Sequence, residues 1–324
     1  MLVLGAKAIE ALMPLERCIT VVADAMQAVS RGDVLSPLRT VMPLGASGAM
    51  GIMPGAMLAQ GCFGVKVVAL YPGNGALGLP SHAGMVLLFD AHSGAPLAVL
   101  ESDSLTALRT AAASAVATRS LARAGSEVLA LLGAGHQALW HARALAQVLP
   151  LRRLQVWSRS RAGAERFVQQ LDLPGKPEIV IADDAHTATR GADVICTVSA
   201  AREPILRGEW LVPGQHVNLV GASVASACEA DSAVVQRSRF FVDARASAQV
   251  QAGEWLQALA SGAVTADHLR GEIGEVLSGQ QVGRASGEDI TVYKSLGHTA
   301  QDLATAQALV ELAKADGGYP DIAW

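Results

Sequence analysis

A glycine-containing turn near the middle of the chain has the residue types of an anion-binding loop. In "LLGAGHQALWHARAL" an apolar run ends at Gly133-Ala134-Gly135, and a helical pattern follows. Gly133 permits a tight turn, and Gly135 lets the backbone approach a ligand that a Cβ would obstruct. The helix N-terminus then presents N–H groups and a positive dipole end to a pyrophosphate. Ala138 occupies the usual third-glycine position, where alanine is an accepted variant. We expect a dinucleotide here, with a plain turn as the alternative.

The end of the next strand favours one form of the cofactor. NAD sites usually carry Asp or Glu at this position, to bind the ribose hydroxyls. Here the chain reads "VWSRSR", with Ser158, Arg159, Ser160 and Arg161. Two guanidinium groups and two hydroxyls suit a 2′-phosphate. We therefore expect NADPH to be preferred and NADH to be possible. The alternative is a solvated loop whose arginines bind nothing.

The turn lies within a strand–helix alternation that must position it. The pattern predicts a strand over Val128–Leu132, a helix over His136–Leu149 and a strand over Leu154–Trp157. The runs "ADVICTVSA", "HVNLVGAS" and "RFFVDA" continue the alternation. This pattern is typical of a Rossmann-type parallel sheet covered by helices.

The segments on either side follow a different pattern. Apolar residues at helical spacing predict an amphipathic helix over Pro14–Ser30, which Gly32 ends. Short apolar runs broken by glycine and proline then predict a mostly antiparallel sheet. The alanine-rich "LTALRTAAASAVATRSLAR" predicts a helix, and a final helix is expected over Thr299–Lys314. The expected fold class is thus α/β, with a second, mixed α+β domain.

Composition excludes several classes of protein. The 324 residues carry a formal charge of −4 without a dense basic run, which argues against nucleic-acid binding. The longest uncharged stretch contains prolines and six glycines, so no membrane span is expected. The four cysteines are scattered and the histidines show no metal-ligand spacing, so we expect buried reduced thiols, no metal and a cytoplasmic location.

Several stretches, taken together and in order, resemble the ornithine cyclodeaminase/mu-crystallin family. They include "LRTVMP", "GVKVVALYPGN", "TALRTAAASAVATRSLAR", "GEIGEVLSGQQVGR" and "DITVYKSLGHTAQDLATA". The resemblance implies a substrate-binding and dimerisation domain from residues 1–118 and 299–324, and a Rossmann domain from residues 119–298. It also implies a homodimer and hydride transfer at a carbon between an imine nitrogen and a carboxylate.

The resemblance also implies which residues form the site. Arg39, Lys66 and Arg109 match the family's substrate-carboxylate site, and their cationic groups suit a small carboxylate. Met53 falls near the substrate's side chain, and His82 faces either the substrate or the nicotinamide, or is structural. The expected cofactor-binding set is Gly133, Ala134, Gly135, His136, Gln137, Ser158, Arg159, Ser160, Thr197, Val198, Val220, Gly221 and Ser295.

Two departures from the cyclodeaminase pattern bear on the reaction. The cyclodeaminases carry carboxylates where this chain has Met53 and Ser223. Cyclodeamination of ornithine needs several proton transfers on a dicationic substrate, which a carboxylate assists and a serine does not. Reduction of a preformed cyclic ketimine needs only a hydride and one proton, which Lys66, Ser223 or a water held by them could supply.

We therefore expect an NAD(P)H-dependent reductase of small cyclic ketimine carboxylates, such as Δ1-pyrroline-2-carboxylate giving L-proline, or the six-membered homologue. The alternatives are an ornithine cyclodeaminase or related amino-acid dehydrogenase, and a non-catalytic, crystallin-like protein that binds NADPH and a small ligand.

Overall fold

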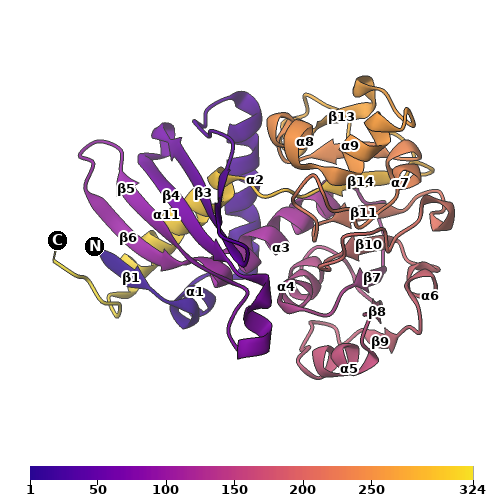
Figure 1. Cartoon of the computed structure of the whole chain (residues 1–324), viewed down its shortest axis with the longest axis horizontal. Helices are drawn as coiled ribbons and strands as arrows, with labels where there is room; N and C mark the ends of the chain where they lie inside the picture. The colour runs from indigo at the N-terminus through magenta and orange to yellow at the C-terminus, as the bar shows by residue number, and fades with distance from the viewer. Residues whose placement is uncertain (324) are drawn as a thin grey trace. The chain divides into compact units, whose positions relative to one another are not determined.

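The computed structural model describes residues 1–323 and divides into two compact units, which Figure 1 shows with their elements labelled. Unit 1 comprises Met1–Arg109 and the C-terminal segment that begins at His298, and unit 2 comprises Thr110–Gly297. The boundary falls inside helix α3 (Ser102–Leu121), whereas the sequence placed it at residue 118. The helix has no break that would mark the change of unit, so the sequence pattern could not locate it.

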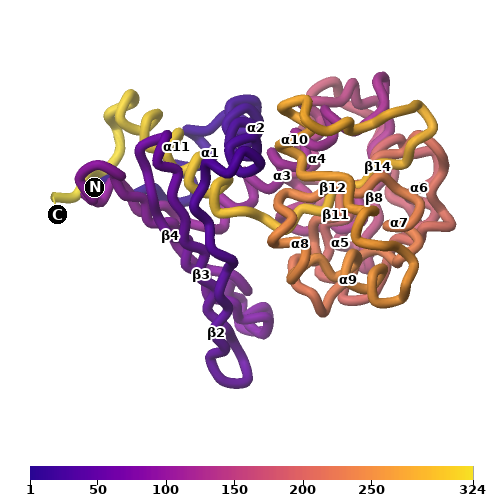
Figure 2. The backbone as a smooth tube through the Cα atoms, turned by 90° about the horizontal axis from the view of Figure 1, so that it is seen from above, coloured from indigo at the N-terminus to yellow at the C-terminus, as the bar shows by residue number. Residues whose placement is uncertain are grey.

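Unit 1 is built on a six-stranded sheet of order β1-β6-β5-β4-β3-β2. As the glycine- and proline-broken runs predicted, β2 to β6 pair antiparallel, and only β1 joins β6 in parallel. Figure 2 shows the β2–β3 hairpin extending from the rest of the unit. The strands are β1 (Leu2–Leu4), β2 (Thr40–Leu44), β3 (Gly48–Met57), β4 (Cys62–Leu70), β5 (His82–Asp90) and β6 (Pro96–Glu101), and 3-10 turns follow β3 (Leu58–Gln60) and β4 (Pro72–Leu77).

Helices cover one face of this sheet. The helix α11 (Thr299–Asp316) contacts β3, β4, β5 and β6, and α2 (Leu15–Arg31) packs on α11. The predicted amphipathic character of α2 is confirmed, because Ile19, Val22 and Met26 are buried on one side. A short helix, α1 (Ala6–Leu12), contacts β6 and α11.

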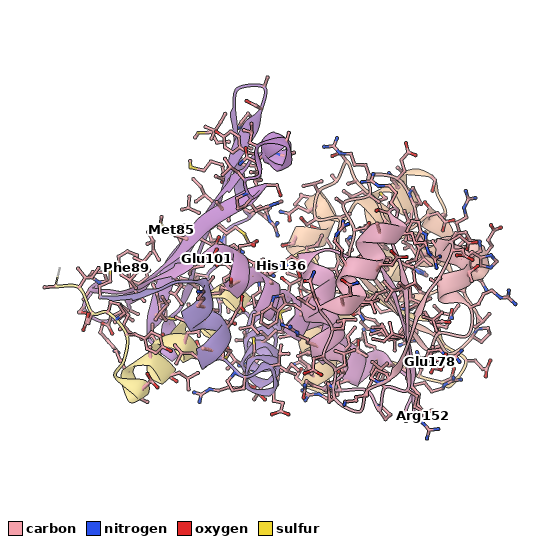
Figure 3. The ribbon with its side chains drawn as sticks, turned by 90° about the horizontal axis from the view of Figure 1, so that it is seen from below. Met85, Phe89, Glu101, His136, Arg152 and Glu178 are labelled. Atoms are coloured by element: carbon pink, nitrogen blue, oxygen red, sulfur yellow. The ribbon has the colours of Figure 1, made fainter. Side chains whose placement is uncertain are left out.

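The opposite face of the sheet is apolar and only half-buried. Val65 pairs with Leu87, and the rings of Phe63 and Phe89 stack with centroids 5.1 Å apart. Met85, labelled with Phe89 in Figure 3, is 56% exposed. This face, which we call the outer face, therefore has a continuous row of apolar side chains in reach of solvent.

Unit 2 contains an eight-stranded parallel sheet of order β13-β12-β14-β11-β10-β7-β8-β9, which confirms the Rossmann-type fold. The central strands β7 and β10 are buried and mostly apolar, as expected when helices cover both sides of the sheet. The central strands β11 and β14 are also buried but carry His216, Asn218 and Lys294. The strands are β7 (Val128–Leu132), β8 (Arg153–Trp157), β9 (Glu178–Ile181), β10 (Val194–Thr197), β11 (His216–Leu219), β12 (Arg239–Val242), β13 (Leu269–Glu272) and β14 (Thr291–Lys294).

The helices of unit 2 follow the predicted alternation, with one correction. The helix α4 ends at Leu145, not at Leu149 as expected. The amides of Gln147 and Val148 bond three residues back, to Ala144 and Leu145, and so tighten the turns that precede Pro150. The others are α5 (Arg161–Gln169), α6 (Ala185–Thr189), α7 (Ser232–Gln236), α8 (Arg245–Gln251), α9 (Gly253–Ala260) and α10 (Ile273–Leu277), with 3-10 turns at Gly208–Trp210 and Ala266–His268.

Two further expectations concern the whole chain. Across residues 1–323, none of the helices combines the length and apolar character needed to cross a bilayer. The four cysteines are free thiols and all are buried, as the scattered spacing predicted.

Candidate active site

The glycine turn adopts the geometry that its residues predicted. Gly133 follows β7 with φ +132°, and a Cβ there would lie 2.4 Å from the carbonyl oxygen of Val198. A Cβ at Gly135 would meet no protein atom within 4 Å. Gly133 is thus required by the fold, whereas the space beside Gly135 is open for a ligand. His136, labelled in Figure 3, begins α4.

The turn borders a cavity of about 300 Å³ within unit 2. The cavity lies at the carboxyl ends of β7, β8 and β10, where the strand order reverses and nucleotides bind in such sheets. Predicted residues that line it are Gly133, Ala134, Gly135, Ser158, Arg159, Ser160 and Val198. The sequence reasoning missed Trp157, Ser199, Ala200, Ala201 and Ile205, which come from the ends of β8 and β10 and the segment that follows.

These residues fit a dinucleotide. No side chain among residues 1–323 caps the N-terminus of α4, so its first N–H groups remain for an anion.

The two arginines of "VWSRSR" have different surroundings. Arg161 pairs with Asp183 at 2.8 Å and with Glu165 at 3.4 Å, while Arg159 lines the cavity. Ser160 caps α5 by accepting the Gly163 N–H.

The remaining predicted cofactor residues do not line this cavity. Gln137 lies in the first turn of α4, and Val220 follows β11, where its amide donates to the Thr197 carbonyl. Thr197 and Gly221 donate to the carboxylate of Glu229, which the sequence reasoning missed. Ser295, the last residue of the predicted cofactor set, is buried after β14. Ser223, which was predicted as a catalytic residue, is half-buried in the loop after β11.

In unit 1, three charged side chains meet in a buried cluster. Oδ1 of Asp302, on α11, accepts from Lys66 Nζ at 3.2 Å and from Arg109 Nε at 2.9 Å. Thr106 accepts a further hydrogen bond from Lys66, and Gln301 accepts from Arg109 Nη1 at 2.8 Å. All three charged side chains are 5% exposed or less.

Burial sets the protonation of this cluster. It lowers the pKa of Lys66 from 10.5 to about 8, against the opposing charge of Asp302. Nearby Arg109 and Arg39 add to the lowering. Burial alone would raise the pKa of Asp302, but the charges of Arg109 and Lys66 outweigh it and hold that pKa below its ordinary value. The cluster therefore holds an ionised aspartate and a lysine that titrates near pH 8.

The other predicted substrate residues differ in position. Met53 pairs directly with Lys66 across β3 and β4 and is 7% exposed, so both lie on the covered face. Arg39 is half-buried just before β2, near enough for its charge to act on Lys66. His82 starts β5, four residues before Val86, the register partner of Lys66. That separation is about 13 Å along the strand, so the structure does not bring His82 into the cluster.

The sequence reasoning missed Asp302 and Gln301. Both fall in the first turn of α11, and both are fully buried. A signal was present, because buried helices rarely carry adjacent polar residues without a partner. The partner could not be identified, since Arg109 and Asp302 are 193 positions apart in the chain.

The chain is similar in sequence to proteins of a known family. The model of the ornithine cyclodeaminase/mu-crystallin family matches residues 1–317. The chain is 38% identical over 281 residues to the ketimine reductase mu-crystallin of Mus musculus, covering 86% of each chain.

Two solved structures are similar over nearly their whole length. A structure of Thermococcus litoralis Δ1-pyrroline-2-carboxylate reductase with NADH and L-proline has a TM-score of 0.95 and 32% identity, covering 99% of this chain and 100% of that one. An archaeal alanine dehydrogenase dimer with bound NAD has a TM-score of 0.94 and 29% identity, covering 100% of this chain and 99% of that one.

Proposed function

Because the chain belongs to the ornithine cyclodeaminase/mu-crystallin family, we propose that it reduces small cyclic ketimine carboxylates with NAD(P)H. Δ1-pyrroline-2-carboxylate giving L-proline, or the six-membered homologue, is the expected reaction. The observation that carries the proposal is the buried cluster of Lys66, Arg109 and Asp302. Similar proteins that are named as ketimine and pyrroline-2-carboxylate reductases support it.

The cluster has the charge to hold a carboxylate. Lys66 and Arg109 supply two buried positive charges, Asp302 supplies one negative charge, and the charge of half-buried Arg39 acts on Lys66 from nearby. A buried excess of positive charge is unfavourable until an anion neutralises it. A guanidinium fork and an ammonium group offer directional donors to such an anion. A small α-carboxylate is the ligand that best matches this arrangement.

Lys66 is the best-placed proton donor. The ketimine nitrogen must carry a proton for the adjacent carbon to accept a hydride, and a reduced nicotinamide supplies that hydride when bound. With a pKa of about 8, Lys66 is largely protonated at neutral pH yet releases a proton more readily than an ordinary lysine. Ser223, in the loop after β11, remains a second candidate.

The cofactor residues in unit 2 favour NADPH. Arg159, Ser158 and Ser160 border the cavity without a carboxylate to bind a 2′-hydroxyl. An exposed guanidinium beside the cavity suits a 2′-phosphate. The similar structures contain NADH or NAD, so NADH is the alternative cofactor.

Cyclodeamination of ornithine is less well supported. Met53 and Ser223 occupy the positions at which the cyclodeaminases carry carboxylates. Asp302 is a carboxylate on α11, but Lys66 and Arg109 both bind it, so it is a counter-charge rather than a free base. The buried cluster also argues against a protein that only stores cofactor.

A homodimer in the cytoplasm completes the proposal. The outer face of the unit 1 sheet, with Phe63, Val65, Leu87 and Phe89, is apolar and half-buried in a single chain. Such faces mark association sites, and a similar structure is described as a dimer. Four free, buried cysteines fit a reducing compartment.

A spectrophotometric assay tests the function. NADPH and NADH, in parallel, are mixed with freshly generated Δ1-pyrroline-2-carboxylate or its six-membered homologue. We expect rapid loss of reduced cofactor and formation of the cyclic amino acid. If neither imine is reduced while ornithine with NAD⁺ releases ammonia, the chain is a cyclodeaminase. If neither reaction occurs and NADPH still binds, it is a binding protein.

A further inference from the structure

A buried carboxylate in unit 2 joins the ends of two neighbouring strands. Glu229 is fully buried and lies on the segment between β11 and α7. Its Oε1 accepts the backbone N–H of Ser199 at 2.7 Å and the Ser199 hydroxyl at 2.6 Å. Its Oε2 accepts the Thr197 hydroxyl at 2.8 Å and the backbone N–H of Gly221 at 2.5 Å. One side chain thus holds the loop after β10 and the loop after β11.

These two loops approach each other closely. A Cβ on Gly221 would lie 2.0 Å from the Ser199 carbonyl oxygen and 2.5 Å from Glu229 Oε1. Ser199 lines the dinucleotide cavity, and Gly221 is two residues before Ser223. The link therefore fixes one wall of the cavity and the loop that carries a candidate catalytic residue.

A second buried pair completes the network. Lys294 Nζ, at the end of β14, lies 2.9 Å from Glu254 Oε2 and donates to the Ala222 carbonyl at 2.5 Å. Glu254 Oε1 accepts the backbone N–H of Glu229 at 3.0 Å. Gly221 and Ala222 are thereby held through an N–H on one residue and a carbonyl on the next.

We propose that Glu229 is a positioning residue for the nicotinamide half of the bound dinucleotide. The adenosine half belongs beside β7 and β8, where the glycine turn and Arg159 lie. The loops after β10 and β11 lie on the other side of the reversal in strand order, where the second half of a dinucleotide binds. Glu229 acts through these loops and does not itself contact the cofactor. This inference rests on the proposed use of a dinucleotide in unit 2.

The role of Glu229 requires a side chain that accepts hydrogen bonds at both of its oxygens. Each carboxylate oxygen accepts one backbone N–H, from Ser199 or from Gly221, and a backbone N–H cannot reverse its role. A glutamine would turn its NH₂ toward one of the two in either orientation. Glu229→Gln therefore releases one loop while it keeps the size of the side chain.

Affinity for two ligands tests the proposal. Three proteins are titrated with NADPH and with 2′,5′-ADP, which is the adenosine end of NADPH. They are the wild type, Glu229→Gln and the control Glu203→Gln. Glu203 is an exposed glutamate just before the cavity-lining Ile205. NADH and AMP replace NADPH and 2′,5′-ADP if NADH binds more tightly. We expect Glu229→Gln to bind the whole dinucleotide roughly tenfold to a hundredfold more weakly, with unchanged affinity for the fragment. Glu203→Gln should match the wild type for both.

Equal losses for the dinucleotide and the fragment would overturn the proposal, because Glu229 would then only support the fold. Unchanged affinity for both would overturn it as well. If Glu229→Gln does not give a folded protein by circular dichroism, Thr197→Val removes one hydroxyl donor to the same carboxylate, and a smaller loss with the same selectivity is expected. No loss in that variant would count against the proposal. Binding is measured without turnover, so failure of the wild type to reduce an imine would overturn the proposed function and leave this test intact.

Discussion

Lys66 is the residue whose surroundings bear most directly on the chemistry. Burial lowers its pKa from 10.5 to about 8. The protonated form both attracts a carboxylate and donates the proton, so both roles are intact well below pH 8 and are lost as the pH rises through that value. We predict that kcat/KM for imine reduction falls above about pH 8.

The variant Lys66→Met separates this residue from other causes of the pH dependence. It should reduce kcat/KM by roughly a hundredfold or more and remove the alkaline limb near pH 8. Lys314→Met, at an exposed position in α11, is the control and should match the wild type. A limb unchanged in Lys66→Met would show that another group titrates.

Asp302 raises the pKa of Lys66 through its opposite charge. Asp302→Asn removes that charge and leaves two buried cations together. We predict that the alkaline limb moves to lower pH and that the free energy of unfolding falls by about 3–5 kcal/mol. Denaturant titration and a pH–rate profile measure the two effects. A limb shifted to higher pH would contradict the assignment of the limb to Lys66.

Arg159 and Arg161 give a matched pair for cofactor choice. Arg159 lines the cavity, whereas Arg161 is already paired with Asp183 and Glu165. Arg159→Ala should weaken NADPH binding by about tenfold to a hundredfold and leave NADH binding nearly unchanged. Arg161→Ala should change neither. Equal effects of Arg159→Ala on both cofactors would argue against a 2′-phosphate site.

The turn between β7 and α4 contains one glycine that the fold requires and one that we expect ligand binding to require. Gly133 is required by the backbone, because its φ is positive and Val198 leaves no room for a Cβ. Gly135 has open space and an extended backbone that alanine can adopt. The two glycines therefore serve different purposes within three residues.

Alanine substitutions test that difference. Gly135→Ala should keep the melting temperature of the wild type while dinucleotide affinity falls by roughly tenfold or more, since the methyl group occupies the phosphate space. Gly133→Ala should lower the free energy of unfolding by about 1–3 kcal/mol. Thermal melting and fluorescence titration distinguish them. A reversed pattern would mean that the turn does not face the ligand.

Elements with a strong local signal were predicted well. The strand Val128–Leu132 has the bounds expected from its apolar run, and α2 begins and ends within a residue of Pro14–Ser30. The short strand Glu178–Ile181 was not predicted, because four residues carry little periodicity. Its place at the sheet edge comes from pairing with β8, which is a tertiary contact.

Across the whole molecule, the sequence motifs selected candidate residues but could not identify the residues that these candidates contact. Lys66 and Arg109 were chosen from their motifs, but their shared partner Asp302 lies on the last helix. Glu229 was missed for the same reason, since its partners Thr197 and Ser199 are some thirty positions away. Contacts between distant segments depend on the fold and leave little local signal.

The outer face of unit 1 predicts a dimer. Val65 lies in the middle of this face, between Pro54 on β3 and Leu87 on β5. Light scattering at micromolar concentration should give twice the monomer mass of 33.4 kDa. Val65→Glu should give monomers, because burying an unpaired charge costs several kcal/mol. Val250→Glu, at a half-exposed position on α8, is the control and should remain dimeric. A monomeric wild type would contradict the prediction.

Transfer of deuterium shows whether the protein moves a hydride from the nicotinamide to the imine carbon. The enzyme is supplied with Δ1-pyrroline-2-carboxylate and with NADPH that carries deuterium at the transferring position of C4. We predict L-proline with one deuterium on its α-carbon, detected by NMR and mass spectrometry, and a loss of that product in Lys66→Met. Unlabelled proline, or no proline while ornithine and NAD⁺ yield ammonia, would contradict it.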